Sequence, residues 1–203
     1  MTAPSAGPVA AAGFPLDLSL DAPETIARWR PLVHWLLAIP HLVVLYGLGI
    51  VEGVVWVLSF FAILFTGQLP ESFFGIMVMV HRYQWRVASY LFFMREDYPA
   101  FEFPTDATDP ATDPARLSVE RAPQLNRWMV LVKWLLAFPH YVILFVLFIA
   151  VYVVGIIGFF AVLITGKWPD GMRDFVIGVM RWSNRVSIYI YLITDIYPPF
   201  SLE

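Results

Sequence analysis

The strongest constraint on this chain is an internal repeat at a constant spacing of 99 residues. Residues 35–41 (WLLAIPH) recur as residues 134–140 (WLLAFPH), and the Thr-Gly-x-x-Pro motif of residues 66–70 recurs at residues 165–169. No insertion or deletion interrupts this correspondence between Leu18 and Phe101. A repeat of this length is one structural module used twice, so the chain must fold as two copies of one unit.

The repeated unit is strongly apolar. Hydrophobic residues make up 59% of the chain and charged residues 14%, whereas soluble domains contain roughly 45–50% and about 25%. The eight Trp, nine Tyr and seventeen Phe residues suit positions at the boundary between lipid and water. A net charge of −3 with scattered Arg and Lys offers no basic face for nucleic acid. We therefore expect a multi-pass membrane protein whose first partner is the lipid bilayer, with no nucleic-acid partner.

The apolar stretch of the first unit is too long for one upright membrane helix. Residues 32–66 carry a single charge, Glu52, and would form a helix of about 52 Å against a hydrocarbon core of about 30 Å. A single helix bent at Pro40, with its first turns in the interface, is one solution, and a hairpin of two short helices is the other. We favour the bent helix, because Pro40 and its copy Pro139 stand where a kink would divide an interfacial segment from a span.

A turn and a second helix follow each apolar stretch. The glycine of Thr-Gly-x-x-Pro is typical of a helix C-cap, and the proline can open the next helix. An amphipathic helix then returns over residues 72–94 and 171–194. The sequence thus predicts a mainly α membrane protein, a tandem duplication of a helical hairpin unit with about four membrane helices. Whether the second helix of each unit spans the bilayer or lies in the interface stays open.

Short stretches that alternate apolar and polar residues flank each unit and are typical of strands. These stretches are residues 16–20, 101–103, 117–120 and 200–202. If both hairpins have all their flanks on one side of the membrane, the four stretches meet, so we expect a small β-sheet at the cytoplasmic surface.

The flanks and the composition also divide the chain. We expect a disordered tail (1–13), a first membrane repeat (14–103), a solvated linker rich in Pro and Asp (104–114) and a second membrane repeat (115–203). Arg and Lys concentrate on the side of the termini, so the positive-inside rule places both termini in the cytoplasm. The two units then run parallel, related by an axis along the membrane normal.

Glu52 is the first candidate functional residue, because a charge at that depth costs roughly 2.5 kcal/mol or more. Antiparallel helices would set it level with Arg86, which lies as far after the turn as Glu52 lies before it, and Arg82 is one turn nearer. We interpret these residues as a buried ion pair that holds helix to helix. A proton or ion path is the alternative.

The second unit has Val151 where the first has Glu52. Its arginines, Arg181 and Arg185, must therefore use Tyr152, Asp174, a lipid phosphate or Glu52 itself. The arginine pairs of both units can also bind anionic lipid headgroups if the second helix lies shallow in the interface, although unspecific snorkelling explains them equally well.

The repeated Pro-His dipeptides can present His41 and His140 to a haem or a metal between the units. The alternative is a histidine that simply bonds the carbonyl freed by the proline kink. No further ligand is spaced nearby, because His34 becomes Lys133 and His81 becomes Met180 in the second copy. We expect no cofactor.

Nothing in the sequence has the pattern of a catalytic centre. There is no nucleophile with a base, no phosphate-binding glycine loop and no carboxylate pair at helical spacing, and the chain has no cysteine. Five tryptophans fit an aromatic anchoring belt: Trp29, Trp35, Trp128, Trp134 and Trp168. We therefore expect that the protein is not an enzyme.

The Pro-His helix, the run LFTGQLP of residues 64–70, and Arg82, Trp85 and Arg86 resemble the bacterial membrane-protein family called domain of unknown function 4389. Both units share the resemblance over nearly the whole chain outside the tail and linker. The second unit, ending DIYPPFSL, is closer to the family pattern, and the first departs from it at Ala100, where the second has Pro199. The resemblance implies a bacterial cytoplasmic (inner) membrane and brings no activity, cofactor or substrate.

Together these features favour a non-enzymatic membrane scaffold, either an oligomer of itself or an accessory subunit of a larger membrane complex. One alternative is a small transporter or channel that uses Glu52 and the arginine pairs at the repeat interface. Another is haem or pigment binding through His41 and His140.

Overall fold

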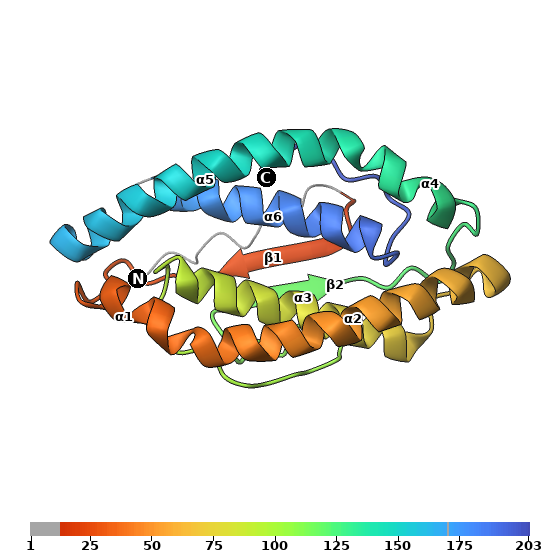
Figure 1. Cartoon of the computed structure of the whole chain (residues 1–203), viewed down its shortest axis with the longest axis horizontal. Coiled ribbons are helices and arrows are strands. Elements are labelled where there is room, and N and C mark those ends of the chain that lie inside the picture. Colours follow the sequence, from red (N-terminus) through yellow and green to blue (C-terminus); the bar gives the residue numbers. More distant parts are fainter. Residues whose placement is uncertain (1–12, 170) are drawn as a thin grey trace, which may run out of the picture.

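The computed structural model describes residues 13–169 and 171–203, in which each unit contributes one strand and a bent pair of helices followed by a returning helix (Figure 1). The elements in chain order are β1 (Leu16–Leu20), α1 (Arg30–Leu37), α2 (Ile39–Thr66), α3 (Glu71–Leu91), β2 (Ala115–Val119), α4 (Met129–Leu136), α5 (Phe138–Thr165) and α6 (Met172–Ile190). The mainly helical class and the two repeated units are confirmed. Apart from Gly13, the expected tail lies outside the described residues.

Each long apolar helix is interrupted just before its proline. α1 ends at Leu37, and α2 begins at Ile39 with Pro40 in its first turn. A proline lacks the N–H that would continue the preceding helix, whereas the first turn of a new helix tolerates it. α2 then runs for 28 residues without a break. The bend at Pro40 is therefore confirmed, and the hairpin of two short helices is wrong.

The turn after each long helix depends on a glycine in the left-handed conformation. Gly67 has a φ of 74° and donates its N–H to Ile63 O at 2.7 Å. Gly166 has the same φ of 74° at the end of α5. Glycine adopts this conformation without a steric penalty, so the predicted C-caps are confirmed.

The two units lie antiparallel. Ile26 donates its N–H to Gly166 O at 2.7 Å, and the equivalent Leu125 donates to Gly67 O at 2.9 Å. Such reciprocal contacts are those of a two-fold rotation. The turn of each unit thus lies beside the start of the other, and the predicted parallel arrangement, with all flanks at one end, is wrong.

The strands explain this arrangement. β1 and β2 are equivalent flanks of the two units, and they pair antiparallel with Leu16 opposite Val119 and Leu20 opposite Ala115. Because equivalent strands run in opposite directions, the helices that follow them do so too. The predicted strand at residues 16–20 is confirmed. The strand predicted at residues 117–120 is observed at Ala115–Val119.

The other two flanks are not strands, so the predicted four-segment sheet is wrong. Residues 101–103 and 200–202 have no regular structure. Their rings are used elsewhere, because Phe101 and Phe200 stack on buried histidines. Main-chain carbonyls in and next to these flanks accept hydrogen bonds from arginines of α3 and α6.

The elements follow one another around the molecule. α3 packs between α2 and β2, and α6 contacts both α5 and β1. The two long helices meet at their ends through contacts of α1 with α5 and of α2 with α4, and the helices and strands extend along the long axis (Figure 1). α2 and α5 lie along opposite long edges of the view, and α3, α6 and the two strands lie between them (Figure 1).

The long helices expose most of their apolar surface. The segments Arg30–Thr66 and Met129–Thr165 have mean hydropathies of 2.3 and 3.0, and only 22% and 17% of their most apolar windows are buried. Both are long and apolar enough to cross a membrane. Trp168 departs from the expected aromatic belt, because it is buried and packs against Gly158.

Candidate functional site

Residues 104–114, expected as a solvated linker, fold against α3. The Asp109 carboxylate lies 3.0 Å from Arg82 Nε and 3.3 Å from Arg86 Nη2, and its side chain is 2% exposed. Arg82 also donates to three main-chain carbonyls, those of Leu117, Pro104 and Asp106, at 2.8–2.9 Å. A buried guanidinium needs such partners for its donors. The linker is thus anchored to the fold through Asp109, although most of its residues are exposed.

A second ion pair holds the end of the linker. Arg95, which follows α3, is buried and bonds the Asp113 carboxylate. Burial lowers the pKa of the Arg82 and Arg95 guanidinium groups, and the facing carboxylates of Asp109 and Asp113 oppose this effect. Arginine starts from so high a pKa that both groups stay charged.

The arginines of the second unit bind carbonyls instead of carboxylates. Arg181 donates to Leu18 O at 3.3 Å and to Leu202 O at 3.1 Å, and Arg185 donates to Ser201 O and Glu203 O. In residues 13–169 and 171–203, neither arginine forms a salt bridge. The expected partners Tyr152, Asp174 and Glu52 are therefore wrong.

These positions also bear on headgroup binding. Arg82, Arg86 and Arg185 are at most 1% exposed, so a lipid phosphate cannot reach them unless the flanking segments move away. Arg181 is half-buried.

Glu52 pairs with a residue that the sequence reasoning missed. Its Oε1 lies 2.9 Å from His81 Nδ1, and the two side chains are 3% and 2% exposed. The predicted partners Arg82 and Arg86 are wrong because neighbouring helix positions point about 100° apart. His81 faces α2, whereas Arg82 faces β2 and the linker.

A signal for this pair was present in the repeat. The second unit replaces Glu52 by Val151 and His81 by Met180. Both polar residues become apolar together, as expected for side chains in contact. The pair lies at the contact between the units, since the His81 ring meets the Tyr191 ring edge-on at 5.1 Å.

His41 and His140 occupy separate aromatic boxes. His41 Nδ1 lies 2.5 Å from Tyr83 Oη, and its ring stacks on Phe101 at 4.3 Å. In the second unit, Trp182 Nε1 donates to His140 Nδ1 at 3.0 Å, and Phe200 stacks on the ring at 4.0 Å.

Both histidines are fully buried, and each contacts side chains of its own unit, so they do not form a shared site between the units. The described part of the chain holds no group of three or more His, Asp or Glu residues suited to a metal ion. A phenyl ring covers one face of each imidazole, where a haem bound between the units would need room. The geometry thus gives the haem hypothesis no support.

Comparison with known proteins identifies the repeated unit. The family described as domain of unknown function (DUF4389) matches residues 28–102 and again residues 127–201. These matches cover the helices of both units. No curated protein and no solved structure matches the chain.

The Asp109 contacts generate the first prediction. Asp109→Asn leaves Arg82 and Arg86 buried without a carboxylate, so we expect a loss of about 3–5 kcal/mol in the free energy of unfolding. Chemical unfolding in mild detergent measures it. Glu102→Gln is the matched control, because this carboxylate lies 3.9 Å from Arg86 and is 51% exposed; its loss should stay below about 0.5 kcal/mol. Equal losses for the two variants would contradict the assignment.

The Glu52–His81 pair generates the second prediction. Glu52→Val and His81→Met should each cost about 1–3 kcal/mol, because each leaves a buried polar group without its partner. The double variant reproduces the Val151–Met180 pair and should cost less than the sum by about 1–3 kcal/mol. A double-mutant cycle measures this difference, and strictly additive losses would show that the two side chains do not interact.

Proposed function

The chain belongs to the DUF4389 family, and we propose that it is a non-enzymatic membrane scaffold. Its two long helices are sunk into one leaflet of a bilayer, and its strands and linker face water and bind another protein subunit. The observation that carries this proposal is the separation of two surfaces. α2 and α5 expose long apolar faces, whereas the strands and the linker expose polar side chains such as Asp17 and Asp106.

The distribution of charge along the molecule supports an in-plane orientation. β1 and β2 lie midway along the long axis (Figure 1), and exposed carboxylates accompany them at Asp17, Glu102 and Asp106. If the long axis crossed the bilayer, these charges would lie near mid-membrane, at roughly 2.5–3.5 kcal/mol each. We therefore favour helices that lie along the membrane over the multi-pass crossing expected from hydropathy.

The exposed tryptophans fit this orientation. Trp29 and Trp35 flank or lie in α1, Trp128 and Trp134 do the same at α4, and all four are 55–72% exposed. Indole rings prefer the interface between headgroups and acyl chains. With α1 and α4 at that level, the two-fold axis lies along the membrane normal, and both ends of the described chain face the same aqueous side, which we propose is the cytoplasm of a bacterium.

The neighbours of the buried polar groups favour a binding protein over an enzyme. Arg82, Arg86 and Arg95 form salt bridges with linker carboxylates, and Glu52 Oε1 lies 2.9 Å from His81 Nδ1. A substrate would have to displace these neighbours of the chain itself before it could bind the charged groups. The polar face is then the functional surface, and its partner is another membrane-protein subunit or a second copy of this chain.

A transporter is the second candidate, and the buried Glu52–His81 pair at the unit contact favours it. Proton or ion flux in proteoliposomes that is lost in the Glu52→Val, His81→Met double variant would support it. Flux equal in both proteins, or absent from both, would dismiss it.

Spin labels test the orientation. The chain has no cysteine, so single cysteines can be placed at Val43, Ile50 and Val57, three exposed positions on one face of α2. An in-plane helix gives the three labels the same depth by oxygen and nickel accessibility, whereas an upright helix changes the depth by about 10 Å per step. A label at Asp106 should be fully accessible to nickel. A regular depth gradient along α2 would overturn the in-plane proposal.

Co-purification tests the scaffold role. Protein extracted from its native membrane in mild detergent should carry a second subunit or form a defined oligomer. Charge reversal of exposed Asp17 and Glu102 on the strand side should release the partner, while Phe65→Ala on the lipid side should not. A monodisperse monomer without any partner would contradict the role.

A further inference from the structure

The two units differ at the centre of the lipid-facing side, where the returning helix of one unit ends against the long helix of the other. Trp56 of α2 lies against the end of α6 and donates its Nε1–H to Ile190 O at 3.0 Å. The equivalent residue of the second unit is Gly155. A Cβ on Gly155 would lie 3.2 Å from the Phe92 ring at the end of α3. Gly155 therefore lies against the end of α3 as Trp56 lies against the end of α6.

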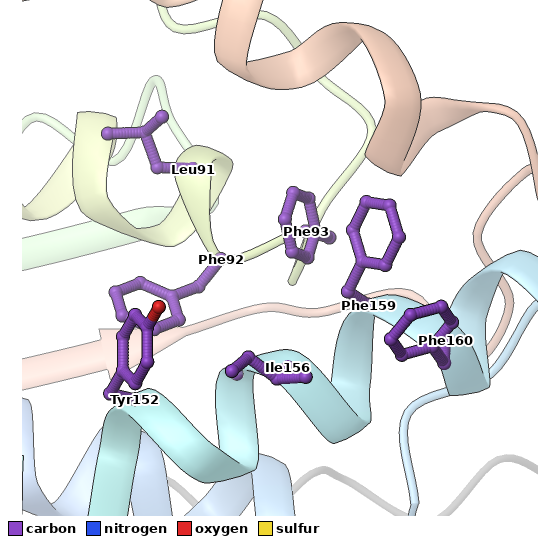
Figure 2. Close-up of a pocket in the computed structure, with 8 residues that line it drawn as sticks. Leu91, Phe92, Phe93, Tyr152, Ile156, Phe159 and Phe160 are labelled. Carbon is purple, nitrogen blue, oxygen red and sulfur yellow. The ribbon is translucent and has the colours of Figure 1, made fainter. Parts of the chain in front are cut away.

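The missing indole leaves a pocket of about 480 Å³. Leu91, Phe92 and Phe93 line it from the end of α3, and Tyr152, Ile156 and Phe159 line it from α5 (Figure 2). Ligand pockets in proteins commonly have volumes of about 300–1,000 Å³ and largely apolar walls. The pocket is therefore of the right size and character for a small apolar molecule.

A main-chain carbonyl at this pocket lacks the partner that its twin has. In α6, Ser187, Ile188 and Tyr189 accept hydrogen bonds from the three amides of Tyr191, Ile193 and Leu192, and Ile190 O accepts from Trp56. In α3 the amide bonds recur, with Ala88, Ser89 and Tyr90 as acceptors. Leu91 O, the twin of Ile190 O, has no hydrogen-bond partner in the described part of the chain. An unpaired carbonyl in apolar surroundings is costly.

Two other differences between the units are compensated. Glu52 and His81 change together to Val151 and Met180, and the Ser59–Leu69 pair becomes Gly158–Trp168. In the latter the indole fills the glycine's space, since a Cβ on Gly158 would lie 2.4 Å from the Trp168 ring.

The change from Trp56 to Gly155 has no such compensation. At this site Phe93 stands where the twin site has Leu192. The Phe93 ring packs on Phe159 and does not fill the pocket. No side chain of the described residues therefore fills the pocket.

We propose that this pocket binds a flat apolar ring carrying one N–H or O–H donor, such as an indole or a phenol dissolved in the membrane. The ring occupies the place that Trp56 fills in the twin site, stacks among Phe92, Phe93 and Phe159, and donates its hydrogen bond to Leu91 O. Trp56 is the internal model for this ligand. The site goes beyond the scaffold role and does not depend on it, whereas entry of the ligand from lipid rests on the membrane placement proposed above.

The ligand enters from the lipid. Tyr152 and Ile156, on the α5 wall, are 71% and 45% exposed on the lipid-facing side of the molecule. Figure 2 shows their side chains at the wall opposite the end of α3. An acyl chain of the bilayer can reach the same place, but it has no donor and would leave Leu91 O unpaired. Recognition of the donor is thus what separates a specific ligand from lipid solvent.

Indole is the probe, and the thermal unfolding midpoint of the protein in lipid nanodiscs is the readout. Indole should raise the midpoint of the wild-type protein in a saturable way. Because 1-methylindole keeps the ring but loses the donor, it should bind about tenfold more weakly. Equal binding of the two compounds would overturn donor recognition and leave an apolar space filled by lipid. This comparison needs no variant.

Two substitutions localise the effect. Gly155→Trp supplies the indole from the chain itself, so added indole should no longer shift the midpoint. Trp56→Gly opens the twin pocket, so the variant should start from a lower midpoint and show a larger rise with indole. If Gly155→Trp does not fold, the Gly155→Trp, Phe92→Tyr variant supplies both residues of the twin site, where Trp56 and Tyr191 stand. A wild-type response to indole in a folded Gly155→Trp protein would overturn the assignment.

Discussion

Buried guanidinium groups are the constraint on which this fold depends. A guanidinium cannot be left unpaired in an apolar interior, and Arg82 meets this demand by bonding β2, the linker and Asp109 at once. Arg181 does the same with β1 and the last residues of the chain. Each returning helix thereby holds a strand beside it, and the two strands then pair antiparallel. That pairing orients the units head to tail and leaves α2 and α5 exposed together.

Because of the duplication, each position of one unit can be compared with the equivalent position of the other. Where the units share a residue, as with the histidine boxes and the left-handed glycines, the residue serves the common fold. Where they differ, the structure distinguishes two cases. Paired changes, such as Glu52–His81 against Val151–Met180, exchange a pair of polar side chains for a pair of apolar ones. The unpaired change from Trp56 to Gly155 leaves a pocket of about 480 Å³ and an unbonded carbonyl, and it is the difference with functional content.

The proposed roles use opposite sides of the molecule. The lipid side offers apolar helices and the pocket between α3 and α5, whereas the strand side offers exposed carboxylates and ordered loops. Because α3 packs directly between α2 and β2, a ligand at the end of α3 touches an element that also supports the polar face. The same arginine contacts that organise the fold hold β2 and the linker against α3.

The sequence by itself determined the features that are written in local pattern: the repeat, the apolar helices, their interruption before Pro40 and Pro139, the glycine caps and the strand at residues 16–20. Each depends on periodicity or on residues within one turn of each other. Only the tertiary structure decided that the units are antiparallel, that the linker is anchored through the buried Asp109 and Asp113, and that Glu52 meets His81 rather than Arg82. Neighbouring helix positions differ by about 100° in direction, so depth alone cannot select a partner. Asp109 likewise resembles any loop carboxylate until the fold brings it against two buried arginines.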